Sequence, residues 1–450
     1  MPFYIRYLNN RKRLLLLIHI FMAYVSSEYS GYSTFWGWSV VVSGVYYIIK
    51  YRNQYNEVGI FSSYIVGLEI ILRMTKAELF WEFGKYGLLI FLLLGLLIDN
   101  IKRHRTSAFI LIYFFSLLPS ILLVPFESFN IWRQFISFNL SGPLTLFISF
   151  LYFRNRIMKD KEVLNMFCSI LLPLISMSVI LIIRVPSIDS VVFGSEANFQ
   201  MSGGYGPNQV SSALGLAIAI ISLSKILGYT IFINNRYDYL ILSICSIQAY
   251  LTFARGGVLT AILAIFTSWV ISIGYNNSGY SRKGKIAYVL IILIVLWNVA
   301  TDFTAGMVEK RYLSIFEINE RGDLVSGTGR LLIMALDLEI FSDNILAGVG
   351  PGISAAMRES YGYGRIVAAH SEFTRVLAEH GILGLIGLLS LFILSIREFF
   401  RHNKNEKCIL SCFTTIAILT MLHSAMRLAM PGFIFGLGFI RLSSFDKNLE

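Results

Sequence analysis

The chain has 450 residues, of which 56% are hydrophobic and only 14% are charged. This composition excludes an ordinary soluble domain, so we predict a polytopic membrane protein. A net charge of +11 in a soluble protein would suggest nucleic acid as a partner. Here the basic residues lie in short segments between apolar runs, where they act as topology signals.

Apolar runs recur from residue 14 to residue 441 without a long polar block. They predict an all-α fold with about twelve to fourteen transmembrane helices, in a single integral-membrane domain over residues 1–450. The first run resembles a signal peptide but lacks a small-residue cleavage site, so we interpret it as a retained span. The predicted spans are 14–28, 34–50, 58–72, 86–99, 107–124, 138–153, 163–183, 208–227, 238–254, 257–275, 286–303, 381–396, 408–426 and 429–441.

Basic clusters follow alternate predicted spans, so all of them lie on one side of the membrane. Because cytoplasmic loops are enriched in Lys and Arg, this pattern predicts that both termini are cytoplasmic. The clusters are Arg11–Arg13, Lys50 with Arg52, Lys102 to Arg105, Arg154 to Lys161, Arg236, Arg282 to Lys285, and Arg397 to Lys407. The external side then receives residues 73–85, 125–137, 184–207 and about 304–370.

The longest external segment, residues 304–370, is too long for a simple connector. Within it, residues 329–341 space apolar side chains three and four apart, with Asp337 and Glu339 toward another face. We therefore predict an amphipathic helix across the membrane mouth, ended by the glycine-rich stretch 348–352. We expect residues 304–370 to form a structured lid with the functional site beneath it.

Arg255 lies in the stretch TFARGGVLT, between two predicted spans. Gly256 and Gly257 lack side chains, which lets a ligand or another helix approach the guanidinium group. An arginine that extends toward the membrane interface is the structural alternative. An arginine at bilayer depth is costly unless an anion pairs with it, and the planar guanidinium suits a diphosphate.

Arg330 follows Ser326-Gly327-Thr328-Gly329, in the first turn of the predicted lid helix. An arginine at this end gives up the favourable interaction with the helix dipole. Together with the free backbone N–H groups it can form an anion site. A solvated loop arginine is the alternative.

His370 lies just ahead of a helix that enters the membrane, in the stretch HSEFTRVLAEHGILGLIG. An imidazole titrates near neutral pH, so it suits a catalytic base, although a single loop histidine is often structural. We expect Ser371 to cap the helix and Glu372 to orient the imidazole. His380 reads as structural, and His423 is ambiguous.

Asn208 follows Gly206-Pro207 at the start of a predicted span, where we expect it to cap the helix, with a role in binding substrate as a second possibility. Asp337 and Glu339 have metal-like spacing, but two turns of one helix explain them more simply. No phosphate-binding loop, GxSxG, HExxH or dinucleotide glycine pattern occurs in a suitable context, and no Cys/His spacing suggests zinc. We predict no metal and no cofactor.

The stretch from His370 to Gly387 resembles the signature of the bacterial O-antigen ligase and polymerase superfamily. In that signature, His with Asn, Ser or Gln is followed nine residues later by GxxGxxG or GxxGxxT. Here His370-Ser371 is followed by nine residues and then by Gly381, Gly384 and Gly387. The Arg-Gly-Gly at Arg255 and the Thr-Gly-Arg at Arg330 resemble the family as well. The resemblance covers about residues 200–390.

The resemblance implies an integral-membrane glycosyltransferase at the outer, periplasmic face of the cytoplasmic membrane. Its donor would be a glycan on undecaprenyl diphosphate. The family's roles make Arg255 and Arg330 the diphosphate clamp and His370 the group that activates the acceptor hydroxyl, without a metal. We also assign Asn208 and Ser371 to substrate binding. These roles agree with the residues, since arginines stabilise a leaving diphosphate and an imidazole accepts a hydroxyl proton.

Two acceptors stay open. A ligase transfers the finished glycan to lipid A core, whereas a polymerase transfers the growing chain to the next lipid-linked repeat unit, and the motif fits the ligase slightly better. A lipid-linked oligosaccharide flippase would also explain many spans. A flippase would be expected to carry charges in several mid-membrane helices or symmetric halves, whereas the notable residues here gather around one external loop.

Overall fold

The protein is described by a computed structural model that covers residues 2–99, 107–126, 128–185, 197–273, 280–313 and 328–443. Every predicted span contains a helix, so the all-α class is confirmed. The helices and strands are α1 (Phe3–Asn10), α2 (Lys12–Glu28), α3 (Ser30–Tyr51), α4 (Glu57–Met74), α5 (Phe83–Ile98), α6 (Ala108–Ser116), the 3-10 helix η1 (Pro119–Leu123), α7 (Phe129–Phe153), β1 (Ile157–Met158), α8 (Asp160–Arg184), α9 (Pro207–Leu227), α10 (Asn235–Leu251), α11 (Arg255–Ile273), α12 (Tyr280–Phe303), α13 (Met307–Leu313), α14 (Thr328–Asp343), α15 (Ser354–Arg358), the π-helix η3 (Glu359–Tyr363), α16 (Glu372–Arg401), α17 (Lys404–Ser424), α18 (Met430–Leu437) and β2 (Arg441–Leu442).

Seven of the described helices are long and apolar enough to cross a membrane, namely α7, α8, α9, α11, α12 over Ile286–Phe303, α16 and α17. The chain is therefore a multi-pass membrane protein. Other predicted spans coincide with helices that are shorter or carry charged residues. Helix α4, for example, contains Glu57, Glu69 and Arg73, and Glu69 forms a buried ion pair with Arg73 at 2.6 Å.

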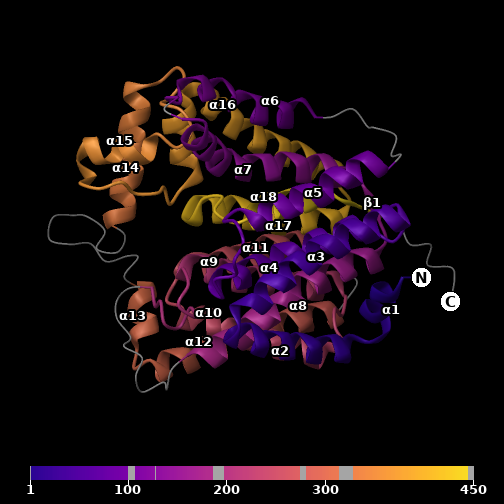
Figure 1. The fold of residues 1–450 in the computed structure, drawn as a ribbon. Helices are drawn as coiled ribbons and strands as arrows, with labels where there is room; N and C mark the ends of the chain where they lie inside the picture. The colour runs from indigo at the N-terminus through magenta and orange to yellow at the C-terminus, as the bar shows by residue number, and fades with distance from the viewer. Residues whose placement is uncertain are drawn as a thin grey trace.

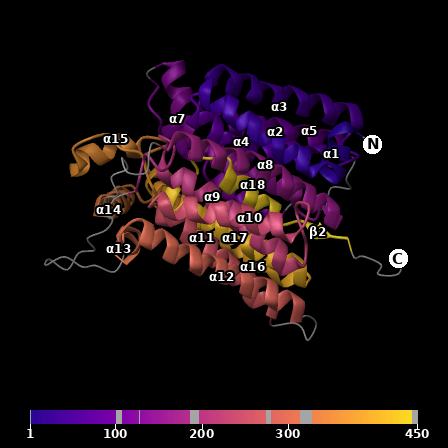
Figure 2. The same cartoon turned by 90° about the horizontal axis from the view of Figure 1, so that it is seen from below.

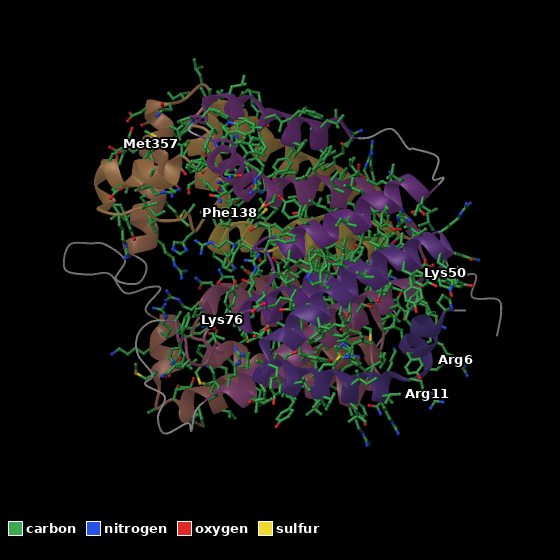
Figure 3. The ribbon with its side chains drawn as sticks, viewed as in Figure 1. Arg6, Arg11, Lys50, Lys76, Phe138 and Met357 are labelled. Atoms are coloured by element: carbon green, nitrogen blue, oxygen red, sulfur yellow. The ribbon has the colours of Figure 1, made fainter. Side chains whose placement is uncertain are left out.

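The helices run side by side between two ends of the molecule (Figures 1 and 2). The first and last described elements, α1 and β2, lie at one end, where Arg6, Arg11 and Lys50 also lie (Figures 2 and 3). Helices α13, α14 and α15 lie at the other end, which we call the lid end. Basic side chains near the termini agree with a cytoplasmic location for that end, which stays a prediction.

Helix α9 forms the centre of the bundle, because its apolar window is completely buried. It packs against α8, α10, α11 and α17. The apolar window of α12, in contrast, is mostly exposed, as expected for a helix that faces lipid. The first turn of α9 therefore offers a fixed platform on which lid residues can be positioned.

The lid contains the predicted helix, which runs over Thr328–Asp343 as α14 and packs against α16. Residues 314–327 of the lid lie outside the described residues. Helix α16 combines two predicted segments, the amphipathic stretch after His370 and the span that was predicted to start at residue 381. The two parts meet at a break at Gly381, whose backbone φ of 61° and ψ of −143° are not helical.

Candidate active site

Arg255 is the first residue of α11, and the glycines that follow it lie within the helix rather than in a separate turn. A Cβ on Gly257 would come within 2.1 Å of the backbone oxygen of Ser211. A Cβ on Gly256 would come within 2.5 Å of Nδ1 of His423. The glycines therefore let α9 and α17 pack closely against the start of α11, which fixes the backbone that carries Arg255.

Arg311 of α13 contacts Arg255 and the backbone just before it. From the sequence we predicted no role for Arg311. The Arg255 Nη1 group donates a hydrogen bond to the backbone oxygen of Arg311 at 2.8 Å. Arg311 Nε donates to the backbone oxygen of Phe253 at 3.3 Å. Arg311 and Arg330 both lie within electrostatic range of Arg255, so the Arg255 guanidinium is repelled by two others at the lid end. An anionic ligand would relieve that repulsion.

Arg330 lies in the first turn of α14, as predicted, and its side chain reaches α9. Its Nη2 group donates a hydrogen bond to Oδ1 of Asn208 at 3.2 Å. Burial lowers the pKa of Arg330 from its ordinary value. The prediction that Asn208 caps α9 was wrong, because Gly206 occupies the N-cap position and Pro207 comes first in the helix. The Asn208 side chain instead binds the arginine.

His370 lies half-buried immediately before α16. Burial lowers its pKa to about 4, and the positive charges of Arg427, Arg330 and Arg358 contribute in the same direction. The imidazole is therefore neutral at pH 7 and has a lone pair that can accept a proton.

Ser371 and Glu372, the two residues after His370, do not have the roles that we predicted. Ser371 occupies the N-cap position of α16, but its side chain makes no capping hydrogen bond. Its hydroxyl is buried and has no hydrogen-bond partner among the described residues. Glu372 does not orient the imidazole, because it forms an ion pair with Arg375 and accepts a hydrogen bond from the backbone N–H of Met426.

The last turn of α17 and the segment after it supply two side chains, of which the sequence left His423 ambiguous and did not indicate Arg427. Arg427 Nη2 donates a hydrogen bond to the backbone oxygen of Ala369 at 2.8 Å, directly before His370. His423 lies against Gly256 and within electrostatic range of Arg330. Neither ring nitrogen of His423 has a hydrogen-bond partner in the part of the chain that the structure describes.

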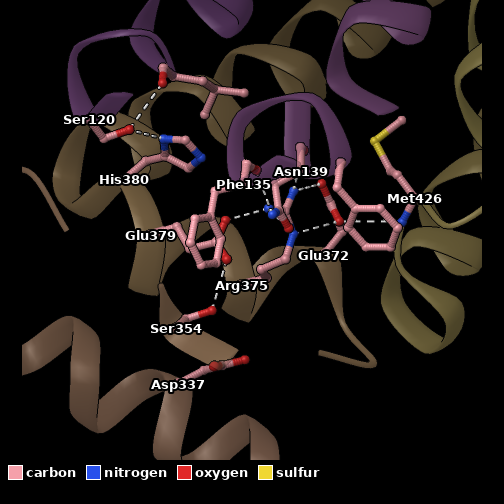
Figure 4. Close-up of polar contacts among 12 residues, drawn as sticks. Ser120, Phe135, Asn139, Asp337, Ser354, Glu372, Arg375, Glu379, His380 and Met426 are labelled. Atoms are coloured by element: carbon pink, nitrogen blue, oxygen red, sulfur yellow. Dashed lines mark hydrogen bonds and ion pairs between the residues drawn. The ribbon is translucent and has the colours of Figure 1, made fainter. Parts of the chain in front are cut away.

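The helical stretch after His370 is held by a buried polar network (Figure 4). Arg375 lies between Glu372 and Glu379 and forms ion pairs with both. It also donates to the backbone oxygen of Asn139 on α7 at 3.2 Å. Glu379 in turn accepts a hydrogen bond from Ser354 of α15 at 2.8 Å. A break in such a network would leave a buried charge without a partner, so the network fixes the position of His370.

A second buried ion pair, between Asp337 and Arg358 at 2.6 Å, joins α14 to α15. Asp337 also accepts a hydrogen bond from Thr374 of α16 at 2.8 Å. Asp337 is therefore buried instead of lying on a polar face, whereas Glu339 is exposed. The two carboxylates do not meet at a metal site. Among the described residues, no group of three or more His, Cys, Asp and Glu side chains is arranged to hold a metal.

Gly381, the first glycine of the signature, is required by the local backbone structure. At the Gly381 break, the helix no longer satisfies the backbone oxygens of the turn before it. The N–H groups of Val349 and Gly350 bond to the oxygens of Ala378 and Glu379, both at 3.0 Å. The backbone of the glycine-rich stretch after α14 thereby completes α16, as helix ends require.

Arg330 is the common neighbour of the residues that the sequence predicted. It binds Asn208 directly and lies within electrostatic range of both Arg255 and His370. Ser371 adjoins His370. The five predicted residues thus come from α9, α11, α14 and the start of α16, and they gather at the lid end.

Comparison with known proteins identifies the central part of the chain. Residues 240–389, a third of the chain, match the family model described as O-antigen ligase. The matched range includes Arg255, Arg330 and His370 and leaves out Asn208 and Arg427. No curated protein and no solved structure matches this chain.

Proposed function

We propose that this chain is a membrane glycosyltransferase that transfers a glycan from undecaprenyl diphosphate to a sugar hydroxyl, a proposal supported by the match of residues 240–389 to the O-antigen ligase family model. The reaction would occur at the periplasmic face of the bacterial cytoplasmic membrane. The observation that supports this proposal best is the position of Arg330, which lies within electrostatic range of both Arg255 and the neutral imidazole of His370. We propose lipid A core as the acceptor, as in a ligase.

The chemistry follows from these groups. The acceptor hydroxyl oxygen attacks the anomeric carbon of the donor and forms the new glycosidic bond. The bond from that carbon to the diphosphate oxygen breaks, and undecaprenyl diphosphate leaves with the electron pair. His370 accepts the hydroxyl proton as the new bond forms. Arg255 and Arg330 stabilise the charge that grows on the leaving diphosphate, most strongly in the transition state.

An apolar groove of about 340 Å³ supports a lipid-linked donor. It lies mainly between α11 and α12, and its lining includes Val258, Ile262, Leu290 and Tyr312. Tyr312 follows Arg311 in the chain, so one end of the groove lies beside the guanidinium groups. A polyprenyl tail in this groove would place its diphosphate next to Arg311 and Arg255.

The proposal is tested by Ala substitution of Arg255, Arg330 and His370 in the purified full-length protein. Transfer from a lipid-diphosphate donor should fall by about a hundredfold or more, because removal of one stabilising group in the transition state commonly has that effect. Arg365→Ala is the control, because Arg365 is an exposed arginine of the same lid. Full transfer by all three variants would contradict the assignment.

Ligase and polymerase are separated by the polysaccharide of a deletion strain. If the protein is a ligase, the strain accumulates free lipid-linked polymer and its lipid A core stays bare. If it is a polymerase, the core carries a single repeat unit. In either case the chemistry at Arg255, Arg330 and His370 is the same, so this experiment tests the acceptor separately from the site.

A further inference from the structure

A cavity of about 650 Å³ with both polar and apolar lining residues opens beside the site, separate from the groove between α11 and α12. Its walls come from the segment that leads into α5, the first half of α7, α15 and the start of α16. Neither Arg255 nor Arg330 lines it. The guanidinium groups at the starts of α11 and α14 therefore lie outside the cavity lining.

The cavity reaches the position of His370. Ala368 and Ala369, the two residues before the histidine, line it. Arg427 lines it as well and binds the backbone oxygen of Ala369. Of the arginines in electrostatic range of His370, Arg330 lies on the side of α9, whereas Arg358 and Arg427 line the cavity. The imidazole is thus within electrostatic range of an arginine bound to α9 and of two arginines that line the cavity.

Three basic groups of the cavity wall, Lys85, Arg358 and Arg375, are paired with carboxylates, whereas Arg133 and Arg427 form no ion pair among the described residues. Lys85 pairs with Glu82 at 2.7 Å. Arg375 pairs with both Glu372 and Glu379. The carboxylates are therefore not available for a cation, and these two basic groups are already neutralised. Apart from Arg133 and Arg427, the wall offers hydrogen-bonding groups whose charges are paired, which suits hydroxyls better than a diphosphate.

Aromatic side chains form the outer part of the cavity. Phe80, Trp81 and Phe138 line it and are 53%, 56% and 49% exposed. Exposed aromatic rings beside polar groups combine an apolar platform with a hydrogen-bonding partner. A sugar has the matching chemistry, since its ring presents C–H groups on its faces and hydroxyls around its edge.

We propose that this cavity binds the acceptor saccharide and directs one of its hydroxyls toward His370. The inference rests on the proposed glycosyl transfer, and it identifies where in the structure the acceptor binds. In a displacement at the anomeric carbon, the attacking hydroxyl and the departing diphosphate lie on opposite sides of that carbon. The cavity is lined by the two residues before His370 but by neither Arg255 nor Arg330, so it gives the acceptor a place apart from the diphosphate. Arg427 positions His370 by holding the backbone of Ala369.

The first test fills the cavity without touching the catalytic groups. Ala355 lines the cavity from α15, whereas its neighbour Ala356 is exposed and does not line it. In the purified full-length protein, Ala355→Trp should raise the KM for the acceptor about tenfold. The KM for the donor and kcat at saturating acceptor should stay within about twofold. Ala356→Trp should leave all three values unchanged.

The second test measures binding without transfer. The probe is the oligosaccharide that mild acid releases from the host's own surface polysaccharide, which carries no diphosphate. Its addition should change the fluorescence of the wild-type protein, and Trp81→Phe should remove that change while Trp132→Phe retains it. Inorganic pyrophosphate should not displace the probe, because it binds at the guanidinium groups instead.

The outcomes distinguish this inference from the proposed function. Equal acceptor KM values for Ala355→Trp and Ala356→Trp in an active enzyme would overturn the cavity assignment and leave glycosyl transfer intact. Absence of transfer by the wild-type protein would overturn the proposed function, and saccharide-dependent fluorescence from Trp81 would still support a saccharide site. Displacement of the probe by pyrophosphate would overturn the separation of the two regions.

Discussion

Arg330 of the lid helix α14 binds the side chain of Asn208 in the first turn of α9, at 3.2 Å, across 122 positions of the chain. An arginine side chain has many rotamers. This hydrogen bond attaches the Arg330 side chain to α9, whose apolar window is completely buried. An arginine held in this way loses less rotamer freedom when it binds a diphosphate.

We predict that Asn208→Ala weakens donor binding. Hydrogen bonds to charged groups contribute about 1.5–3 kcal/mol, so kcat/KM for the donor should fall about tenfold or more. Asn208→Asp should lower it further, because the new carboxylate would pair with Arg330 and compete with the diphosphate. Steady-state kinetics with varied donor measure both effects. Unchanged kcat/KM in Asn208→Ala would show that the bond does not orient Arg330 for the donor.

We predict different pH profiles for kcat/KM and kcat. His370 of the free protein has a pKa of about 4, so it is neutral over the usual range and kcat/KM should be flat from about pH 5 to 8. A bound diphosphate adds negative charge, which raises the pKa of His370. The acidic limb of kcat should therefore lie at higher pH than the limb of kcat/KM.

We predict that substitution of Arg427 shifts the pKa of His370 upward. Its positive charge disfavours protonation of His370, so Arg427→Met should raise the pKa of the free imidazole. The acidic limb of kcat/KM should then move to higher pH. Arg365→Met, which alters an exposed lid arginine, should leave the limb in place. An identical limb in Arg427→Met and the wild-type protein would refute the electrostatic account of His370.

Sequence patterns predicted those features of the fold that depend on local order. Apolar runs marked the helices because a membrane demands long apolar segments. The spacing of residues 329–341 marked the position of α14 but not its faces, because Leu331 and Leu338 are exposed while Asp337 is buried. The break at Gly381 was not predicted, because it depends on backbone groups of Val349 and Gly350 more than 25 residues away. Nothing in the local pattern shows which carbonyl oxygens a distant segment will bind.

The site divides in the same way. Arg255, Arg330 and His370 stand in short, recognisable motifs, whereas Arg311 and Arg427 do not, although both lie beside them. Their positions follow from how α13 and the segment after α17 pack. Sequence alone also could not show whether a carboxylate near the site is free or paired. Asp337 is paired and buried, contrary to its predicted place on a polar face.

We predict that Gly381→Ala destabilises the protein. The φ of 61° and ψ of −143° lie near a region that only glycine adopts readily, which costs about 1–3 kcal/mol for other residues. The new Cβ would also lie 2.5 Å from the backbone oxygen of Ile345. The thermal unfolding midpoint of the purified protein should fall. Gly31→Ala is the control, because no atom lies within 4 Å of its added Cβ.

We predict that the ion pair between Asp337 and Arg358 behaves as a unit. Arg358→Met leaves the Asp337 carboxylate buried without its partner, and loss of one member of such a pair costs about 3–5 kcal/mol. The double variant Arg358→Met/Asp337→Leu should recover most of the lost thermal stability, because no charge remains buried. A double variant no more stable than Arg358→Met would mean that other contacts of Arg358 dominate.

We predict that filling the groove between α11 and α12 lowers transfer more for a donor with a long lipid tail than for a donor with a short one. Ile262→Trp fills the groove, so it should lower transfer from a donor with a long polyprenyl tail about tenfold. A donor with a farnesyl tail extends less far along the groove and should be affected much less. Leu263→Trp is the control, because Leu263 is exposed on the same helix and does not line the groove. If the lipid tail occupies the groove, the loss of transfer should depend on both the length of the tail and the face of α11 that carries the substitution. Equal losses of transfer with the two donors, or equal losses in the two variants, would therefore place the tail elsewhere.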